Sequence, residues 1–385
     1  MRVPVARTPD RVETYELFFD LVYVFTLIQI TRTIAADGTL TGIVHGSVVL
    51  LIVWWVWVVF TTMANMGLPE SDRRDWRPLI FAVAMGLVLL MALSIPEAFW
   101  GDSKLFAYAY LALAVLGAGG QLWVTRADPV ATRGLRRMWA VAFILPVLLV
   151  VSSYIANTTL SVVLIAIGLL SAIVAPFAAG TGNMPLSTTH LAERYSLFML
   201  ITLGESIISI GEGATKATMS WLLIACVLIA FALVVILWRH YVVAVLQPGE
   251  KALHRLEGAR QATYARYGYT FTHLPMVWGI IIIAVAIKSA MVDLTTPLDD
   301  LLEAGLALGV LVFLAATTVF SRLTGEPLRA RMLIPLGLLA ILAVGGWHLP
   351  TAVLIVAVTA IAAIGIDPRA LGLRAPAEQG ESSEG

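Results

Sequence analysis

Uninterrupted apolar segments of about 20 residues recur along almost the whole of this 385-residue chain. A helix needs roughly that length to cross the hydrocarbon core of a bilayer, because it rises about 1.5 Å per residue. Hydrophobic residues make up 59% of the chain and charged residues 13%, whereas a soluble domain has about 45–50% and about 25%. The chain is therefore expected to be an all-α polytopic membrane protein. A soluble globular enzyme, a disordered chain and a coiled coil are excluded.

The apolar pattern predicts about twelve transmembrane helices. They are expected at residues 15–35, 42–65, 78–98, 105–124, 138–156, 159–179, 196–213, 219–246, 268–288, 302–320, 331–346 and 350–366. The last two are short and separated only by Gly345–Pro350, so they form either two full spans or a re-entrant pair. The first is not a cleaved signal peptide, because it carries Asp20 and Gln29 and another span follows it at once.

Basic residues are distributed very unevenly between the predicted loops. With twelve spans, 20 of the 25 Lys and Arg residues fall in the termini and alternate loops, and four fall in the intervening loops. Cytoplasmic loops are enriched in Lys and Arg, so both termini are expected in the cytoplasm of a bacterial cell, with the helices in its inner membrane. Residues 1–14 would be a short cytoplasmic segment, and the polar residues 367–385 a disordered cytoplasmic tail.

The sequence also suggests an internal repeat. At an offset of 180 residues, Glu13–Phe18 aligns with Glu193–Phe198 at four of six positions, and each copy lies where a predicted span begins. This motif alone would not exceed chance in an apolar chain, but the span pattern adds to it. We predict two six-helix units, residues 15–179 and 180–366. Because six is even, the two units would be parallel repeats, an arrangement found in transporters.

Charge and motif content narrow the classes of partner. The chain has 25 basic and 25 acidic residues, so no electrostatic footprint for nucleic acid is present. The lone Cys226 excludes a disulfide framework and a thiolate metal cluster. No P-loop, GxGxxG turn, HExxH or nucleophile-elbow serine is found. We therefore predict no cofactor and no metal, and expect the lipid bilayer and an unidentified small solute or ion as partners. The oligomeric state is left open.

Ionisable side chains within the predicted spans are the candidate functional residues. Each costs roughly 2.5–3.5 kcal/mol on insertion scales, so such residues are seldom kept without a role. In the first span Glu13, Glu16, Asp20 and Tyr23 share one helical face. The two glutamates also fit an interfacial position, whereas Asp20 is immersed in the span.

Glu205 is the second candidate, because it lies near the middle of the seventh predicted span with Ser209 on the same face. It would be either part of a site or one half of a structural ion pair, for which Arg194, Arg239 and His273 are the candidate partners. His273, at the start of the ninth span, fits a proton carrier and a hydrogen-bonded structural histidine equally well. The mid-span run Trp54–Trp57 fits helix packing, or the lining of a cavity.

Two of these segments resemble signatures of the bacterial low temperature requirement protein A family. Glu16–Phe25 is similar to its opening signature, and Glu193–Phe198 continuing to Ser206 is similar to its second. The stretch Tyr269–Pro275 with Gly279 also resembles the family, and the likeness would cover roughly residues 8–366. The resemblance implies a multi-pass protein of the bacterial inner membrane. The family name describes a growth phenotype, so the resemblance implies no substrate.

Three functions remain open from the sequence. The first is a secondary transporter or ion/proton pathway, which the predicted repeat and the immersed Asp20 and Glu205 favour. The second is a membrane-embedded enzyme for a lipid or isoprenoid substrate, with Asp20 or Glu205 as general acid or base. The third is a non-catalytic membrane component of cold or stress adaptation whose buried acids are ion-paired. A water-filled path reaching Asp20 or Glu205 would favour the first, and a closed apolar chamber opening sideways to lipid would favour the second. Carboxylates bidentate to arginine, with no cavity, would favour the third.

Overall fold

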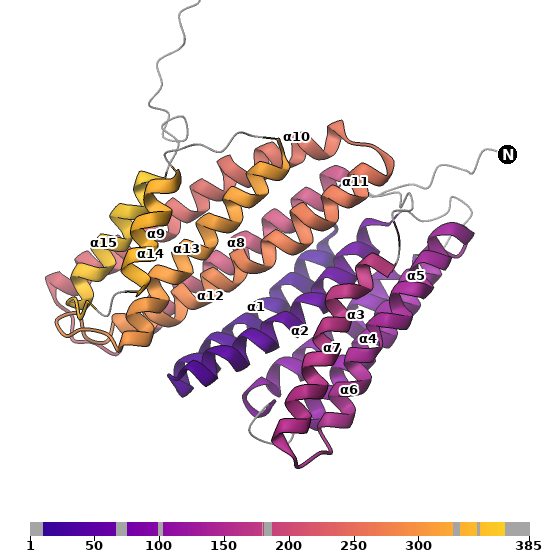
Figure 1. The fold of residues 1–385 in the computed structure, drawn as a ribbon, viewed down its shortest axis with the longest axis horizontal. Coiled ribbons are helices and arrows are strands. Elements are labelled where there is room, and N and C mark those ends of the chain that lie inside the picture. Colours follow the sequence, from indigo (N-terminus) through magenta and orange to yellow (C-terminus); the bar gives the residue numbers. More distant parts are fainter. Residues whose placement is uncertain are drawn as a thin grey trace, which may run out of the picture.

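The computed structural model describes residues 11–66, 75–98, 103–178, 180, 187–325, 332–344 and 347–365. Within these ranges the chain is helical, and no strand is present apart from an isolated bridge between Pro297 and Pro350. The helices form two groups (Figure 1), α1–α7 and α8–α15, with α1 and α2 of the first group facing α8 and α12 of the second. The core of the molecule therefore includes the contact between its two halves.

The first group consists of α1 (Thr14–Asp37), α2 (Leu40–Asn65), α3 (Arg77–Leu93), the short 3₁₀ helix η1 (Ile95–Glu97), α4 (Lys104–Val124), α5 (Pro129–Ala142), α6 (Ile144–Ser152) and α7 (Thr158–Ala178). The second consists of α8 (Thr188–Ala214), α9 (Trp221–Tyr241), the π-helical η2 (Val242–Leu246), α10 (Gln247–Arg255), α11 (Gly258–Tyr264), the π-helical η3 (Ala265–Phe271), α12 (Thr272–Ala290), α13 (Asp300–Leu323), α14 (Leu333–Val344) and α15 (Thr351–Ile364).

Nine helices in the described part of the chain are long and apolar enough to cross a membrane, with α5–α6, α9–α10 and α11–α12 each running on as one. Shorter apolar helices occupy the positions of the third, eleventh and twelfth predicted spans: α3 with 17 residues, α14 with 12 and α15 with 14. The all-helical membrane architecture is thus confirmed. The total of twelve spans stays a prediction, as does the arrangement of residues 331–366.

Several helices begin earlier or continue further than the apolar pattern indicated. Residues 247–266 were expected to form a loop, but they form α10 and α11, which η2 and η3 join to α9 and α12. The eighth helix starts at Thr188 rather than at 196, because the Ser187 side chain caps it by accepting from the His190 N–H. Polar helical turns of this kind carry no apolar signal, so the sequence pattern did not reveal them.

Small residues let two central helices approach closely. Gly279 of α12 and Gly309 of α13 face each other, and a Cβ added to Gly279 would lie 2.6 Å from the Gly309 carbonyl oxygen. Only glycine at these positions permits this backbone contact. The contact fixes α12 and α13 against each other, and α12 in turn packs on α8 and α1.

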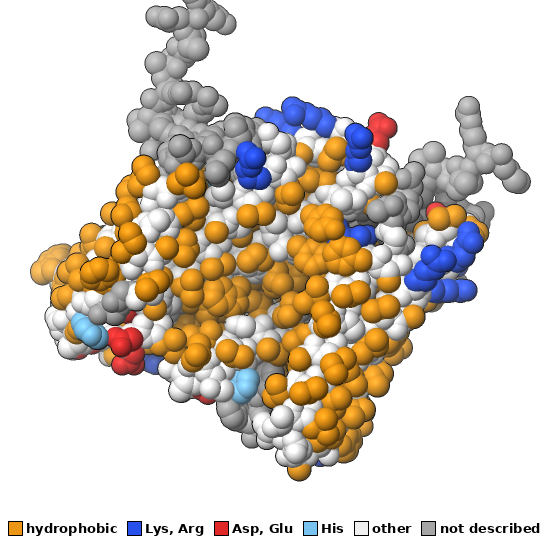
Figure 2. Space-filling view, in the orientation of Figure 1, with side chains coloured by type: hydrophobic (Ala, Val, Ile, Leu, Met, Phe, Trp, Pro, Cys, Tyr) orange, Lys and Arg blue, Asp and Glu red, His pale blue; other side chains and the backbone are white. Residues whose placement is uncertain are grey.

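Hydrophobic and charged side chains occupy different parts of the surface. Hydrophobic side chains cover most of the face in Figure 2, and Lys and Arg side chains gather at one end, over α10, α11 and α5. Acidic and histidine side chains lie at the opposite end of the same face. This is the distribution expected for a protein whose apolar middle contacts lipid and whose two ends contact water.

Candidate functional site

The candidate site lies along the contact between α1 and α8. The two helices run in the same direction: the Val12 N–H donates to Glu193, while two turns further along α1 Asp20 contacts Arg194. At the far end, Arg32 of α1 contacts Glu212 of α8. Polar contacts therefore follow one another along a single pair of parallel helices. They form three levels, around Asp20 and Arg194, around Glu205, and around Glu212.

Four ionisable side chains meet at the first level, and each is completely buried. Arg194 Nη2 lies 2.8 Å from Asp20 Oδ1, and Arg194 Nε lies 3.5 Å from Glu16 Oε2. His190 Nε2 lies 3.0 Å from the same oxygen of Glu16. We call Glu16, Asp20, His190 and Arg194 the inner cluster.

The local sequence explains how the inner cluster assembles. Glu16 and Asp20 are four residues apart on α1, and His190 and Arg194 are four residues apart on α8. Residues at this spacing lie on one face of a helix, so two pairs of polar side chains meet when the helices pack side by side. The spacing of His190 and Arg194 was visible in the sequence, but His190 was missed because residue 190 precedes the predicted span.

Many polar atoms of the inner cluster lack hydrogen bonds. Among the described residues, no hydrogen bond is found for either Glu16 oxygen, Asp20 Oδ2, either His190 ring nitrogen, or Arg194 Nε and Nη1. Glu16 Oε2, His190 Nε2 and Arg194 Nε have the ion-pair contacts given above. Most buried polar groups in folded proteins are hydrogen-bonded, and an unsatisfied one requires an explanation such as a functional role, a water or an ion. The inner cluster thus has capacity to bind further polar atoms or protons.

The net charge of the inner cluster also favours the binding of a proton or a cation. With both carboxylates ionised and His190 neutral, one guanidinium faces two negative charges. A net charge in a dehydrated interior is costly unless it is balanced. One proton or one monovalent cation would neutralise the inner cluster.

Aromatic rings close the inner cluster on the side of the membrane centre. Trp57 Nε1 donates to Asp20 Oδ1 at 2.9 Å, and its ring packs on Tyr195 and Phe198 at centroid distances of 4.8 and 4.3 Å. Tyr23, which shares a face with Asp20, donates instead to the Val53 carbonyl oxygen at 3.0 Å. Trp54 and Trp57 are therefore packed in the core, as the packing interpretation of this run predicted, whereas Trp55 of the same run lines the apolar chamber described below.

Glu205 forms the second level and is 2% exposed. The Ser209 hydroxyl lies 3.4 Å from its Oε1, and the Thr31 hydroxyl of α1 lies beside its carboxylate. Its Oε2 has no hydrogen-bond partner. Arg32 and Lys288 form their ion pairs with Glu212, one level further along the helix pair. Glu205 is thus a buried carboxylate among hydroxyl groups.

Arg194 and His273, two of the three candidate ion-pair partners of Glu205, have other contacts. Arg194 contacts the acids of α1 instead, about three turns away from Glu205 along α8. His273 Nε2 forms a hydrogen bond of 3.1 Å with the Tyr241 hydroxyl. The His273 ring stacks on the Tyr269 ring with an interplanar angle of 8°. Asp20 and Glu205 thus belong to separate groups of contacts.

The third level lies at the other end of the helix pair. Glu212 bridges two cations, with Arg32 Nη2 and Lys288 Nζ each 2.6 Å from one of its oxygens. The Arg32 side chain is about half exposed, in agreement with a snorkelling position at the membrane surface. This level is thus the most exposed of the three.

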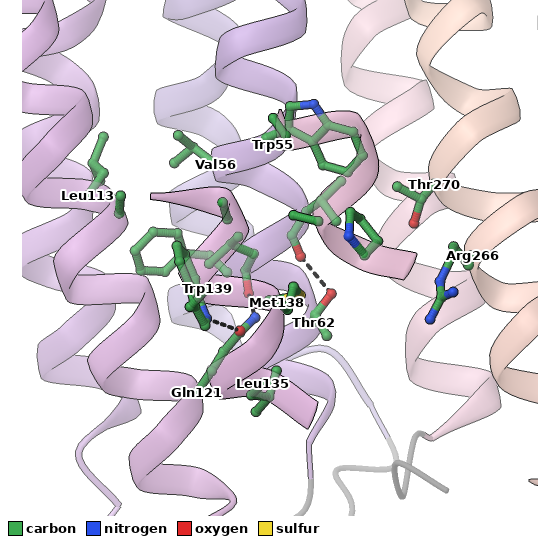
Figure 3. A pocket seen from close by; sticks show the side chains of 18 of the residues that line it. Trp55, Val56, Thr62, Leu113, Gln121, Leu135, Met138, Trp139, Arg266 and Thr270 are labelled. Carbon is green, nitrogen blue, oxygen red and sulfur yellow. Dashed lines mark hydrogen bonds between the residues drawn. The ribbon is translucent and has the colours of Figure 1, made fainter. Parts of the chain in front are cut away.

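An apolar chamber of about 170 Å³ lies next to the helix pair, between the two halves (Figure 3). Trp55, Leu135, Met138 and Trp139 line it, and Arg266 and Thr270 lie at its other side. Inside it, Gln121 accepts from Trp139 Nε1 at 2.9 Å. Neither Asp20 nor Glu205 lines this chamber.

Long apolar helices with ionisable groups buried between them define a polytopic α-helical membrane protein. The model of the family described as bacterial low temperature requirement A protein (LtrA) matches residues 11–366. The chain belongs to this family. It is 31% identical over 333 residues to the uncharacterized protein RA0937 of Rhizobium meliloti (strain 1021), a match that covers 81% of this chain and 78% of that protein. No solved structure matches the chain.

Proposed function

We propose that this protein is a secondary transporter or ion/proton-conducting protein of the bacterial inner membrane, and that protons or cations bind the acids between α1 and α8. The observation that carries the proposal is the inner cluster, which is fully buried and has two carboxylates for one guanidinium. Within the described chain, seven of its polar atoms make no hydrogen bond, and three of those seven have only an ion-pair contact. Glu205 supplies a second buried acid on the same helix pair, and Glu212 lies at the water-exposed end.

The two alternatives gain less support. An enzyme using these acids would need a substrate chamber beside them, but the apolar chamber is lined by neither Asp20 nor Glu205. A purely structural role fits the contacts of Arg194 with Glu16 and Asp20, and neither described cavity is lined by Asp20 or Glu205. It does not account for Glu205, whose charged form is costly without a cationic partner.

We also propose that the two halves are parallel six-helix repeats. Equivalent helices pack in the same way in each half: α1 on α2 and α3, as α8 packs on α9 and α12, and then α3 on α4, as α12 packs on α13. The pair α1 and α8 would then be equivalent helices, which supports their parallel course. In such transporters the binding site lies between the repeats.

Reconstituted protein tests the proposed function. When a pH gradient is imposed across liposomes, we expect at least one of a panel of alkali cations and small organic anions to move with the gradient. Asp20→Asn should reduce this flux strongly because it removes one of the two inner acids, whereas Glu97→Gln, at an exposed position, should leave it unchanged. If wild-type liposomes move protons and every solute no faster than protein-free liposomes, the proposal fails.

The proposed cytoplasmic position of both termini has its own test. In a Cys226→Ser background, a cysteine at Ser103 should react with a membrane-impermeant thiol reagent only from outside the cell. A cysteine at Arg133 should react only from the cytoplasm, because this part of α5 is rich in arginine and cytoplasmic segments are enriched in Lys and Arg. Labelling of position 103 from the cytoplasmic side alone would contradict this orientation.

A further inference from the structure

Three side chains with metal-binding atoms meet at the end of the second group of helices away from α10 and α11. Asp300, Glu303 and His348 each offer one ligand atom, and these atoms lie within 4.8 Å of one another. Figure 2 shows acidic and histidine side chains together at this end of the molecule. The site is separate from the inner cluster and from Glu205.

Glu303 distinguishes this group from an ordinary acidic surface. The residue is 1% exposed, and its Oε1 has no hydrogen-bond partner in the described part of the chain. Its Oε2 accepts the His348 backbone N–H at 3.1 Å, and His348 Nδ1 lies 3.3 Å from Asp300 Oδ1. A buried carboxylate with one oxygen free of hydrogen bonds thus lies beside two exposed side chains that carry metal-binding atoms.

The backbone holds these ligands in place. Asp300 and Glu303 are three residues apart in the first turn of α13, which puts them on one face. His348 has a left-handed backbone conformation (φ 47°) that is uncommon outside glycine. The segment that follows it is tied to the segment before α13, since the Thr351 and Ala352 N–H groups donate to the carbonyl oxygens of residues 296 and 294. A strained histidine held against two acids is consistent with preorganised ligation.

We propose that Asp300, Glu303 and His348 bind one divalent first-row transition-metal ion, with water completing its coordination. Two carboxylate oxygens with one imidazole nitrogen form a donor set that suits such ions. The sequence predicted no metal because Glu303 and His348 are 45 residues apart, and no spacing motif joins them. The bound ion would tie α13 to the segment that precedes α15.

Zinc binding to the purified full chain in detergent, after removal of any affinity tag, tests the proposal by isothermal titration. We expect one equivalent of Zn²⁺ to bind. Glu303→Gln and His348→Asn should each weaken binding at least about tenfold. Asparagine tolerates the left-handed conformation, so His348→Asn removes the imidazole without forcing the backbone to change.

Asp299→Asn is the matched control, because Asp299 is exposed, adjoins Asp300 and is not among the three ligands. It should bind Zn²⁺ as the wild type does. Melting temperatures without metal identify a variant that fails to fold, in which case Asp300→Asn, at an exposed position, takes its place. The proposal is overturned if the wild type binds no equivalent of Zn²⁺, if it binds only Mg²⁺ or Ca²⁺, or if the folded ligand variants bind Zn²⁺ unchanged.

Discussion

Arg194→Gln is expected to lower the free energy of unfolding by about 3–5 kcal/mol, because it leaves a buried ion cluster without its cation. Arg194 is fully buried, and its guanidinium is within 4 Å of both Glu16 and Asp20. Without it, two carboxylates would face each other in the interior with only His190 beside them. Denaturant or thermal unfolding of the purified protein in detergent measures the loss.

The exposed Arg136 of α5 provides the control for this experiment. Arg136→Gln should change stability by no more than about 0.5 kcal/mol, as surface substitutions usually do. Adding Asp20→Asn to Arg194→Gln should recover part of the loss, since the double variant has one acid fewer to strand. If Arg194→Gln is as stable as the wild type, the ion pairs of the inner cluster contribute nothing to folding.

Glu205→Gln is expected to abolish ion or proton flux while leaving the protein folded. Glutamine has nearly the same shape as glutamate and can still accept from Ser209, but it cannot bind and release a proton. Since Arg32 and Lys288 form their ion pairs with Glu212, the substitution strands neither of these charges. Stability should therefore hold or rise, because a buried carboxylate no longer has to be desolvated.

The two substitutions therefore distinguish the role of the inner cluster from that of Glu205. A variant at Arg194 loses stability first, whereas a variant at Glu205 loses flux alone. Flux in proteoliposomes and unfolding in detergent, measured on one preparation, decide between them. A Glu205→Gln protein that is folded and conducts like the wild type would show that Glu205 is no part of the pathway.

The helical membrane fold could be predicted from the sequence because the bilayer imposes it. Apolar segments of about 20 residues have few folded alternatives, and α2, α4 and α7 lie close to the predicted ranges. The ends of the helices were harder to predict from the sequence. Pro129 begins α5 and Ser187 caps α8 outside the apolar segments, so polar helical turns beyond the membrane core escaped the hydropathy pattern.

Side-chain partners were the least predictable feature. Asp20 and Glu205 were recognised as immersed acids from their positions alone, and the structure buries both. Which cation accompanies which acid depends on the rotation and relative height of α1 and α8, which no local pattern encodes. From the sequence, Arg194 was one of three candidate partners for Glu205, whereas packing places it against Asp20, 174 residues away.

Proton uptake driven by a membrane potential, at equal pH on both sides of the bilayer, tests the central claim most directly. Liposomes loaded with potassium and a pH-sensitive dye receive valinomycin, so that the outward movement of potassium draws protons inward through any conducting protein. The proposed function predicts that the rate of internal acidification rises with the amount of wild-type protein and falls to that of protein-free liposomes for Glu205→Gln. Wild-type liposomes that acidify no faster than protein-free ones, with sodium uptake equally slow under the same potential, would contradict the account.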